Sequence, residues 1–225
     1  MRRARYHRHP DDLRAVPTAA GVIDVTTIFI ARHGETVWHA ENRYAGVSDI
    51  PLTEHGLEQA RALAAWAEDA NLDAVYSSPL QRATTTASSS AEAAGVHLSI
   101  DSRLIEIDWG QGEGLTRVEM AAAFPAAYES FVANPASSPL PDGESGQAAI
   151  ERIMPALDEI VHRYPAGRVL VVGHSTVTRL IIATVTGMDL ERYRSTMPHV
   201  GNCTLTILRF SPTGTALLGF NLPTS

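Results

Sequence analysis

Apolar residues in this chain gather in short runs that are separated by longer amphipathic stretches. The runs at 26–31, 74–76 and 168–172 are largely apolar, as expected for strands that are buried on both faces of a sheet. Three further short strands are predicted at 96–100, 204–209 and 215–220. The chain therefore has enough strands for one central sheet.

Between the strands, apolar residues recur with a helical period. A first helix has an apolar face formed by Leu57, Ala60, Leu63, Ala64 and Ala67. Thr53 is placed to cap this helix. Further helices are predicted at 79–94, with Ser78 as the cap and Pro79 in the first turn, at 144–163 and at 175–186.

The alternation of strands and helices predicts the fold class. Such an order is typical of an α/β protein, a three-layer sandwich in which a mostly parallel central sheet carries helices on both faces. The segment 104–143 contains clustered glycines and prolines around an alanine-rich stretch. We expect it to form a small helical insertion over the site, within a single domain of residues 25–225.

Residues 1–24 follow neither period. The segment is basic and is interrupted by Pro10 and Pro17, and its positive or titratable side chains are Arg2, Arg3, Arg5, His7, Arg8, His9 and Arg14. Asp11 and Asp12 argue against a transit peptide, and there is no apolar core of a secretory signal. We therefore expect a flexible basic extension outside the fold.

Charge and cysteine content narrow the function classes. The 225-residue chain has a formal net charge of −7, which argues against nucleic acid or an anionic membrane as its main partner. No apolar run is long enough to cross a bilayer. The single cysteine, Cys203, excludes an internal disulfide and a structural thiolate zinc site. A cytoplasmic location is expected.

Basic residues stand where three predicted strands end. Arg32 and His33 follow the first strand, Arg82 lies in the first turn of the helix after the second, and His174 directly follows the third. The carboxyl ends of parallel strands share one sheet edge, where helix amino termini present free N–H groups to anions. Arginine offers a planar fork of donors, and neutral histidine can act as a nucleophile. These residues predict a shared phosphate site.

The same residues belong to a longer ordered set of motifs within residues 26–210. The set contains Arg32-His33-Gly34-Glu35-Thr36 with Trp38, Asn42-Arg43-Tyr44-Ala45-Gly46, Asp49, Leu52-Thr53, Gly56, Gln59-Ala60, Ser77-Ser78-Pro79-Leu80-Gln81-Arg82-Ala83, Glu106 with Trp109-Gly110, and Gly173-His174. This set resembles the histidine phosphatase superfamily, in the branch that contains the cofactor-dependent phosphoglycerate mutases and many related phosphatases.

The resemblance implies a role for each residue. His33 is implied to attack phosphorus and form a phosphohistidine. The phosphoryl oxygens are implied to be held by Arg32, Arg82 and His174. Glu106 is implied to act as general acid and then as general base. No metal or other cofactor is expected, because the side chains supply the positive charge.

Further candidates are less sharply defined by the resemblance. His39 stands where many relatives have asparagine, and it is either a phosphate donor or a surface histidine. Ser175 stands where the phosphatases usually have glycine, and either binds phosphate or caps the helix that follows. Gly46 is a further candidate phosphate-binding residue. The candidate substrate contacts are Asn42, Ala45, Trp109 and Arg117.

We expect a metal-independent phosphatase for a small phosphorylated metabolite, such as a sugar phosphate. A phosphoglycerate mutase that depends on 2,3-bisphosphoglycerate is the alternative, although the mutases' adjacent arginine pair is missing from the insertion. A non-catalytic protein that binds phosphorylated ligands is the second alternative, and the presence of Glu106 argues against it. A homodimer through the sheet edge or the first helix is considered.

Overall fold

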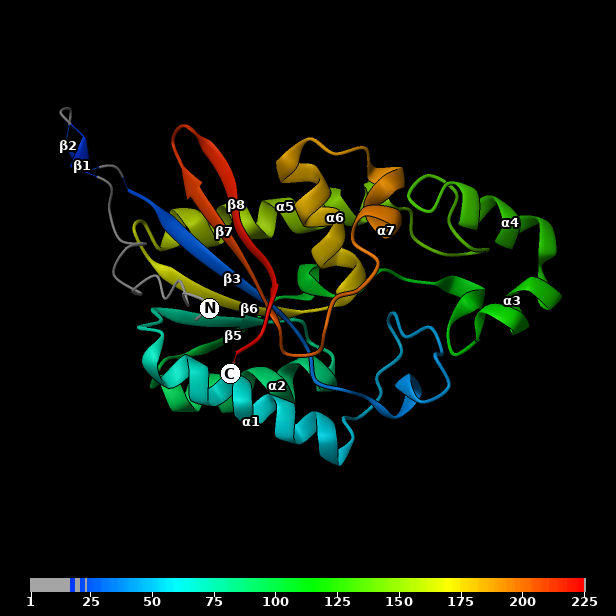
Figure 1. Ribbon diagram of the computed structural model, residues 1–225, viewed down its shortest axis with the longest axis horizontal. Helices are drawn as coiled ribbons and strands as arrows, with labels where there is room; N and C mark the ends of the chain where they lie inside the picture. Colours follow the sequence, from blue (N-terminus) through cyan, green and yellow to red (C-terminus); the bar gives the residue numbers. More distant parts are fainter. Residues whose placement is uncertain (1–16, 19–20, 23, 225) are drawn as a thin grey trace, which may run out of the picture.

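The computed structural model describes residues 17–18, 21–22 and 24–224, and it has the predicted α/β architecture (Figure 1). Residues 1–16, which make up most of the predicted extension, lie outside the described residues. Within it, β1 (Pro17–Thr18) pairs antiparallel with β2 (Gly21–Val22), in a segment for which the sequence predicts no regular structure.

The central sheet has six strands in the order β5-β4-β6-β3-β7-β8. Their bounds are Thr26–Arg32 for β3, Ala74–Ser77 for β4, Leu98–Ile100 for β5, Arg168–Gly173 for β6, Leu205–Ser211 for β7 and Gly214–Leu222 for β8. The pairs β3–β6, β4–β6 and β4–β5 are parallel. The pairs β3–β7 and β7–β8 are antiparallel. The sheet is therefore parallel where the basic residues were predicted to meet.

Helices cover both faces of the sheet. Figure 1 shows α1 (Glu54–Asp69) and α2 (Gln81–Ala94) on one face, and α5 (Gly146–Arg163) and α6 (Ser175–Thr186) on the other. Successive side chains of a strand point to opposite faces, so each buried strand contributes to two cores. In β3, Phe29 belongs to the cluster with α1 and α2, whereas Ile28 belongs to the cluster with α5 and α6.

Two predicted helix starts differ from the observed ones. The helix predicted from Pro79 begins at Gln81, because the Ser78 N–H still donates to Val172 O at 3.2 Å and extends the sheet pairing. Asp49, distant in sequence, accepts from the Gln81 N–H at 2.7 Å and supplies the missing cap. The helix predicted from residue 144 begins at Gly146 with Ser145 as its cap. Thr53 caps α1 as predicted, accepting from the Gly56 N–H at 3.0 Å.

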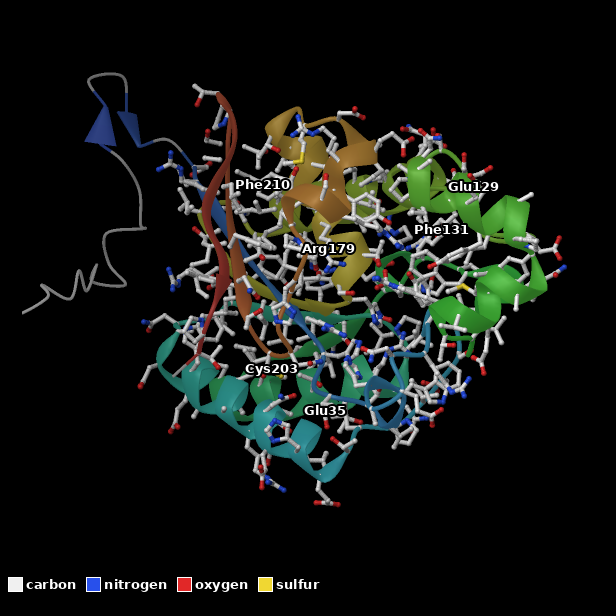
Figure 2. All side chains as sticks on the ribbon, turned by 45° about the vertical axis from the view of Figure 1, so that its right-hand side comes forward. Glu35, Glu129, Phe131, Arg179, Cys203 and Phe210 are labelled. Atoms are coloured by element: carbon white, nitrogen blue, oxygen red, sulfur yellow. The ribbon has the colours of Figure 1, made fainter. Side chains whose placement is uncertain are left out.

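The insertion lies beside the carboxyl edge of the sheet. It contains α3 (Arg117–Ala123) and α4 (Pro125–Ala133), which Figure 1 shows in green to the right of the sheet. The short helix α7 (Tyr193–Thr196) lies between α6 and β7 in the chain and close to α4 in both views (Figures 1 and 2). Among the described helices, none is both long enough and apolar enough to cross a membrane.

Leu157 tests the core between α5 and the sheet. Its side chain is fully buried, so Leu157→Ala is expected to leave a cavity and to lower the free energy of unfolding by about 2–5 kcal/mol. Chemical denaturation followed by circular dichroism measures the change. Asp158→Ala, at the exposed neighbouring position of the same helix, is the control and is expected to change stability by less than about 0.5 kcal/mol. Equal effects of the two substitutions would contradict this packing.

Candidate active site

The parallel pair β3–β6 brings two histidines together. β3 ends at Arg32 and β6 at Gly173, and these two residues face each other in the register. His33 and His174 follow directly, and the His33 N–H donates to Gly173 O at 3.0 Å. Their ring centroids lie 5.2 Å apart, and both side chains are buried. The sheet thus places two segments 141 positions apart at one point.

The His33 ring is oriented by its own loop. Its Nδ1 lies 2.7 Å from Gly34 O, and because a carbonyl can only accept, Nδ1 carries the proton. The lone pair therefore lies on Nε2. Burial lowers the pKa of His33 well below its ordinary value of 6.5, and the neighbouring charges of Arg32 and Arg82 lower it further. The ring is neutral near physiological pH.

Arg32 is fixed on both sides. Nη1 donates to Val200 O at 2.8 Å, and Nη2 donates to Nε2 of His39 at 2.5 Å. His39 lies beside Arg32 on the cavity wall, and burial followed by the charge of Arg32 lowers its pKa to about 4. Of the two readings of His39 left open by the sequence, the geometry favours a residue of the site.

Arg82 is fully buried in the first turn of α2, near enough to His33 to lower its pKa. Nη1 donates to Ser48 O at 2.7 Å and Nη2 to Gly46 O at 2.6 Å. Gly46, predicted to bind phosphate, lies outside the cavity lining: its N–H donates to Glu113 at 3.2 Å, and a Cβ there would meet Ile107 O at 2.2 Å. Gly46 is therefore placed where it orients Arg82.

Several buried side-chain nitrogens of Arg32, Arg82 and His174 have no partner in the part of the chain that the structure describes. These atoms are Nε of Arg32, Nε of Arg82 and both ring nitrogens of His174. Burial lowers the pKa of His174 well below 6.5, so one of its ring nitrogens is a donor and the other an acceptor. Unsatisfied buried polar atoms are rare in folded proteins, and a bound ligand is one explanation. All three residues are near enough to His33 to lower its pKa, so an anion next to His33 fits these free positions.

Glu106 is held at the amino terminus of α6. Its carboxylate accepts from the N–H of Thr176 at 2.9 Å and of Val177 at 3.1 Å, and also from the N–H of Ile107 at 3.0 Å. Free N–H groups in the first turn of a helix bind negative charge well. The side chain is 4% exposed and lines the cavity. A carboxyl group is thus fixed on the cavity wall that also contains His33.

A cavity of about 1080 Å³ opens beside this cluster. The predicted site residues that line it are Arg32, His33, His39, Asn42, Ala45, Glu106, Trp109, Arg117 and Ser175. The predicted site residues that do not line it are Gly46, Arg82 and His174. In the described residues, no group of three or more His, Cys, Asp or Glu side chains is arranged to hold a metal ion.

Three arginines of the cavity wall are not among the predicted site residues, and two of them, Arg179 and Arg194, belong to no predicted motif. Arg179 lies in α6, four residues after Ser175, so the helical period from a predicted site residue could have found it. Arg194 lies in α7, a segment for which no element was predicted. Its contacts are with residues distant in sequence, and no local pattern indicates it. Figure 2 shows the labelled Arg179 between the sheet and the insertion that carries Phe131.

The chain is similar in sequence and in fold to several known proteins. "Phosphoserine phosphatase 1" of Hydrogenobacter thermophilus is 33% identical over 168 residues, which are 75% of this chain and 80% of that protein. A "probable phosphoglycerate mutase GpmB" of Salmonella arizonae is 33% identical over 161 residues, 72% of this chain and 75% of that protein. A solved mycobacterial glucosyl-3-phosphoglycerate phosphatase superposes with a TM-score of 0.80 at 25% identity, covering 87% of this chain and 99% of the other.

The family itself matches most of the sequence, from the middle of β3 to the end of the sheet. The match includes the ends of β3 and β6, the start of α2 and the loop that carries Glu106. Residues 28–223 match the histidine phosphatase superfamily, branch 1, and the chain belongs to that family.

Proposed function

We propose that this protein hydrolyses a small phosphomonoester without a metal ion, through a phosphohistidine on His33. One observation carries the proposal: among the described residues, buried nitrogens of Arg32, Arg82 and His174 have no partner, and these three residues lie next to a neutral imidazole. The named phosphatases among the relatives support phosphoric monoester hydrolysis as the activity. The relatives' printed names differ in substrate, so the particular ester comes from the site and not from them.

In the first step, Nε2 of His33 attacks phosphorus and the bond from phosphorus to the ester oxygen breaks. Glu106 has to bind a proton before this step, because its three N–H partners favour the carboxylate. It gives this proton to the departing oxygen, and the alcohol leaves. In the second step, Glu106 takes a proton from water, and the oxygen of the resulting hydroxide attacks phosphorus. The phosphorus–nitrogen bond breaks, inorganic phosphate leaves, and the imidazole is free again.

The arginines stabilise the charge on the transferring phosphoryl group. In such reactions catalysis is mostly positioning and electrostatic stabilisation, which is strongest when the charged groups are already in place. Backbone carbonyls hold both guanidinium groups, with Val200 O bound to Arg32 and with Ser48 O and Gly46 O bound to Arg82. Little reorganisation is therefore needed when substrate binds.

A phosphoglycerate mutase is the second candidate, favoured by the relative of that name. The same phosphohistidine would then pass its phosphoryl group to a hydroxyl group instead of water. Interconversion of 3- and 2-phosphoglycerate in the presence of 2,3-bisphosphoglycerate, with little release of inorganic phosphate, would favour the mutase. Release of inorganic phosphate as the main product favours the phosphatase.

Removal of the nucleophile tests the proposal directly. His33→Ala is expected to lower phosphate release on the order of 10³-fold or more, and to abolish acid-labile phosphate on protein quenched during turnover of a ³²P-labelled ester. His55→Ala, an exposed histidine of α1, is the control and is expected to keep both. A chelator is expected to leave the rate unchanged. Full activity of His33→Ala would contradict the mechanism.

Glu106→Gln tests the proton transfer. The substitution keeps the shape of the side chain but removes the transferable proton, so kcat for an alkyl phosphate is expected to fall about 100- to 10,000-fold. An aryl phosphate with an acidic leaving group needs less help from an acid, and its phosphorylation step is expected to slow much less. Rapid-quench measurement of phosphoenzyme formation separates the two. The same loss for both esters would argue against Glu106 as the acid.

The protonation state of His33 gives a pH test. Because its folded pKa lies well below 6.5, the ring is expected to stay neutral and nucleophilic at pH 6, where an ordinary histidine is mostly protonated. NMR titration of ¹⁵N-labelled histidines measures this, with His33→Ala identifying the signal. On further acidification the ring takes up a proton and the nucleophile is lost. A midpoint near 6.5 would contradict the effect of burial.

A further inference from the structure

The cavity carries more positive charge than one phosphoryl group requires. Five arginines line it against two carboxylates, and the set is Arg32, Arg43, Arg117, Arg179 and Arg194 with Glu41 and Glu106. Arg43 is already neutralised, since it lies 2.7 Å from Glu41 and 3.0 Å from Glu119. The cavity histidines do not add charge, because burial lowers the pKa of His33 and His39.

Arg194 is held rigidly but is not neutralised. Its guanidinium carbon lies 4.4 Å from the centroid of the Phe131 ring, and it also lies over the rings of Tyr44, Trp109 and Tyr193. We call these four rings the aromatic box. Nε donates to Tyr193 Oη at 2.8 Å and Nη1 to Tyr44 Oη at 3.1 Å. No carboxylate among the described residues forms an ion pair with it.

Arg179 lies near both Arg194 and Arg32, and Arg32 is the arginine next to His33. Its Nη2 donates to Pro198 O at 3.1 Å, and its buried Nε has no partner within the described residues. Burial is the largest cause of the lowered pKa of Arg32 and of Arg179, and Glu106 acts against it at both. The charge of Arg179 lowers the pKa of Arg32 further, and the charge of Arg194 does the same to Arg179. The guanidinium group of Arg179 is therefore near enough to repel that of Arg32 and that of Arg194.

With Arg43 paired to Glu41 and Glu119, Glu106 is the one remaining carboxylate of the described lining, against Arg32, Arg117, Arg179 and Arg194. This excess of positive charge favours a ligand that is itself anionic at more than one place. Resting on the proposed function, we propose that the substrate carries a second anionic group besides its phosphoryl ester, a carboxylate or a second phosphoryl group, and that Arg194 binds it. A guanidinium group presents a planar fork that matches either anion. The cavity of about 1080 Å³ has room for such a metabolite.

Of the predicted substrate contacts, Trp109 and Arg117 belong to the segment 104–143. The structure adds α6 and α7, which supply Arg179 and Arg194 of the cavity wall. The insertion contributes the ring of Phe131 on which Arg194 lies. The residue that selects the substrate is thus supported by one element and carried by another.

Matched substrate pairs test the inference. 3-Phosphoglycerate and glycerol 3-phosphate share a three-carbon skeleton and differ in one carboxylate, whereas fructose 1,6-bisphosphate and fructose 6-phosphate differ in one phosphoryl group. In one pair, we expect kcat/KM for the member with the second anionic group to exceed that of its partner about 10- to 100-fold. The pair that shows the preference identifies the anion. Equal kcat/KM within both pairs overturns the inference.

Arg194→Met separates binding from packing. Methionine fills a similar volume in the aromatic box and makes favourable contacts with rings, but it has no charge. Its kcat/KM for the preferred anionic ester is expected to fall about 10- to 100-fold, mostly through KM, with glycerol 3-phosphate changed less than about twofold. Arg194→Lys is expected to recover part of the loss. A loss of equal size on esters with and without the second anionic group would make Arg194 a packing residue and overturn the inference.

Arg192→Met is the matched control, because this arginine lies two residues earlier in the chain and is exposed outside the cavity lining. The ratio of kcat/KM between the two members of the preferred pair is expected to be the same in this variant as in the unmodified protein. Calorimetric titration of His33→Ala with 3-phosphoglycerate and glycerol 3-phosphate, and with the two fructose phosphates, measures the preference without turnover. If the variant binds a member with the second anionic group more tightly, while the unmodified protein hydrolyses none of the four esters, the proposed function is refuted and this inference is kept. Equal affinities within both pairs would refute the inference alone.

Discussion

The site depends on the register between β3 and β6. Arg32 faces Gly173 in that pairing, and the His33 N–H donates to Gly173 O, so the two strands end together. A slip of one residue would turn every side chain of a strand to the other face of the sheet. The apolar alternation of β3, with Ile28 on one face and Phe29 on the other, prevents such a slip. The core packing therefore fixes where the two histidines meet.

Burying positive charge is unfavourable, and the surrounding backbone compensates for it. Carbonyl groups bind the outer nitrogens of Arg32 and Arg82, while helix N–H groups bind the carboxylate of Glu106. Other nitrogens of Arg32, Arg82 and His174, the residues next to His33, have no partner within the described residues. In a site shielded from water these charges act more strongly than they would at the surface. Each polar group thus has a fixed direction before any ligand binds.

Much of the fold and part of the site could be predicted from the sequence, because the signals are local. The strand before Arg32 and the helix capped by Thr53 each carry their own pattern, and a general rule for parallel sheets joined their ends. The start of α2 at Gln81 could not be predicted, since its cap comes from Asp49, 32 positions away. Arg194 was missed for the same reason, because Tyr44, which binds it, is 150 positions away.

Under the proposed mechanism, the nitrogens of Arg32, Arg82 and His174 that have no partner in the described residues also affect the release of product. Inorganic phosphate presents the same oxygens as the ester from which it came, so the product fits the donors that bound the substrate. Departure of phosphate then competes with entry of the next molecule, and accumulating product inhibits turnover. A ligand that binds only the folded chain also stabilises it in proportion to the logarithm of its concentration. Ambient phosphate would therefore slow this enzyme and at the same time protect it from unfolding.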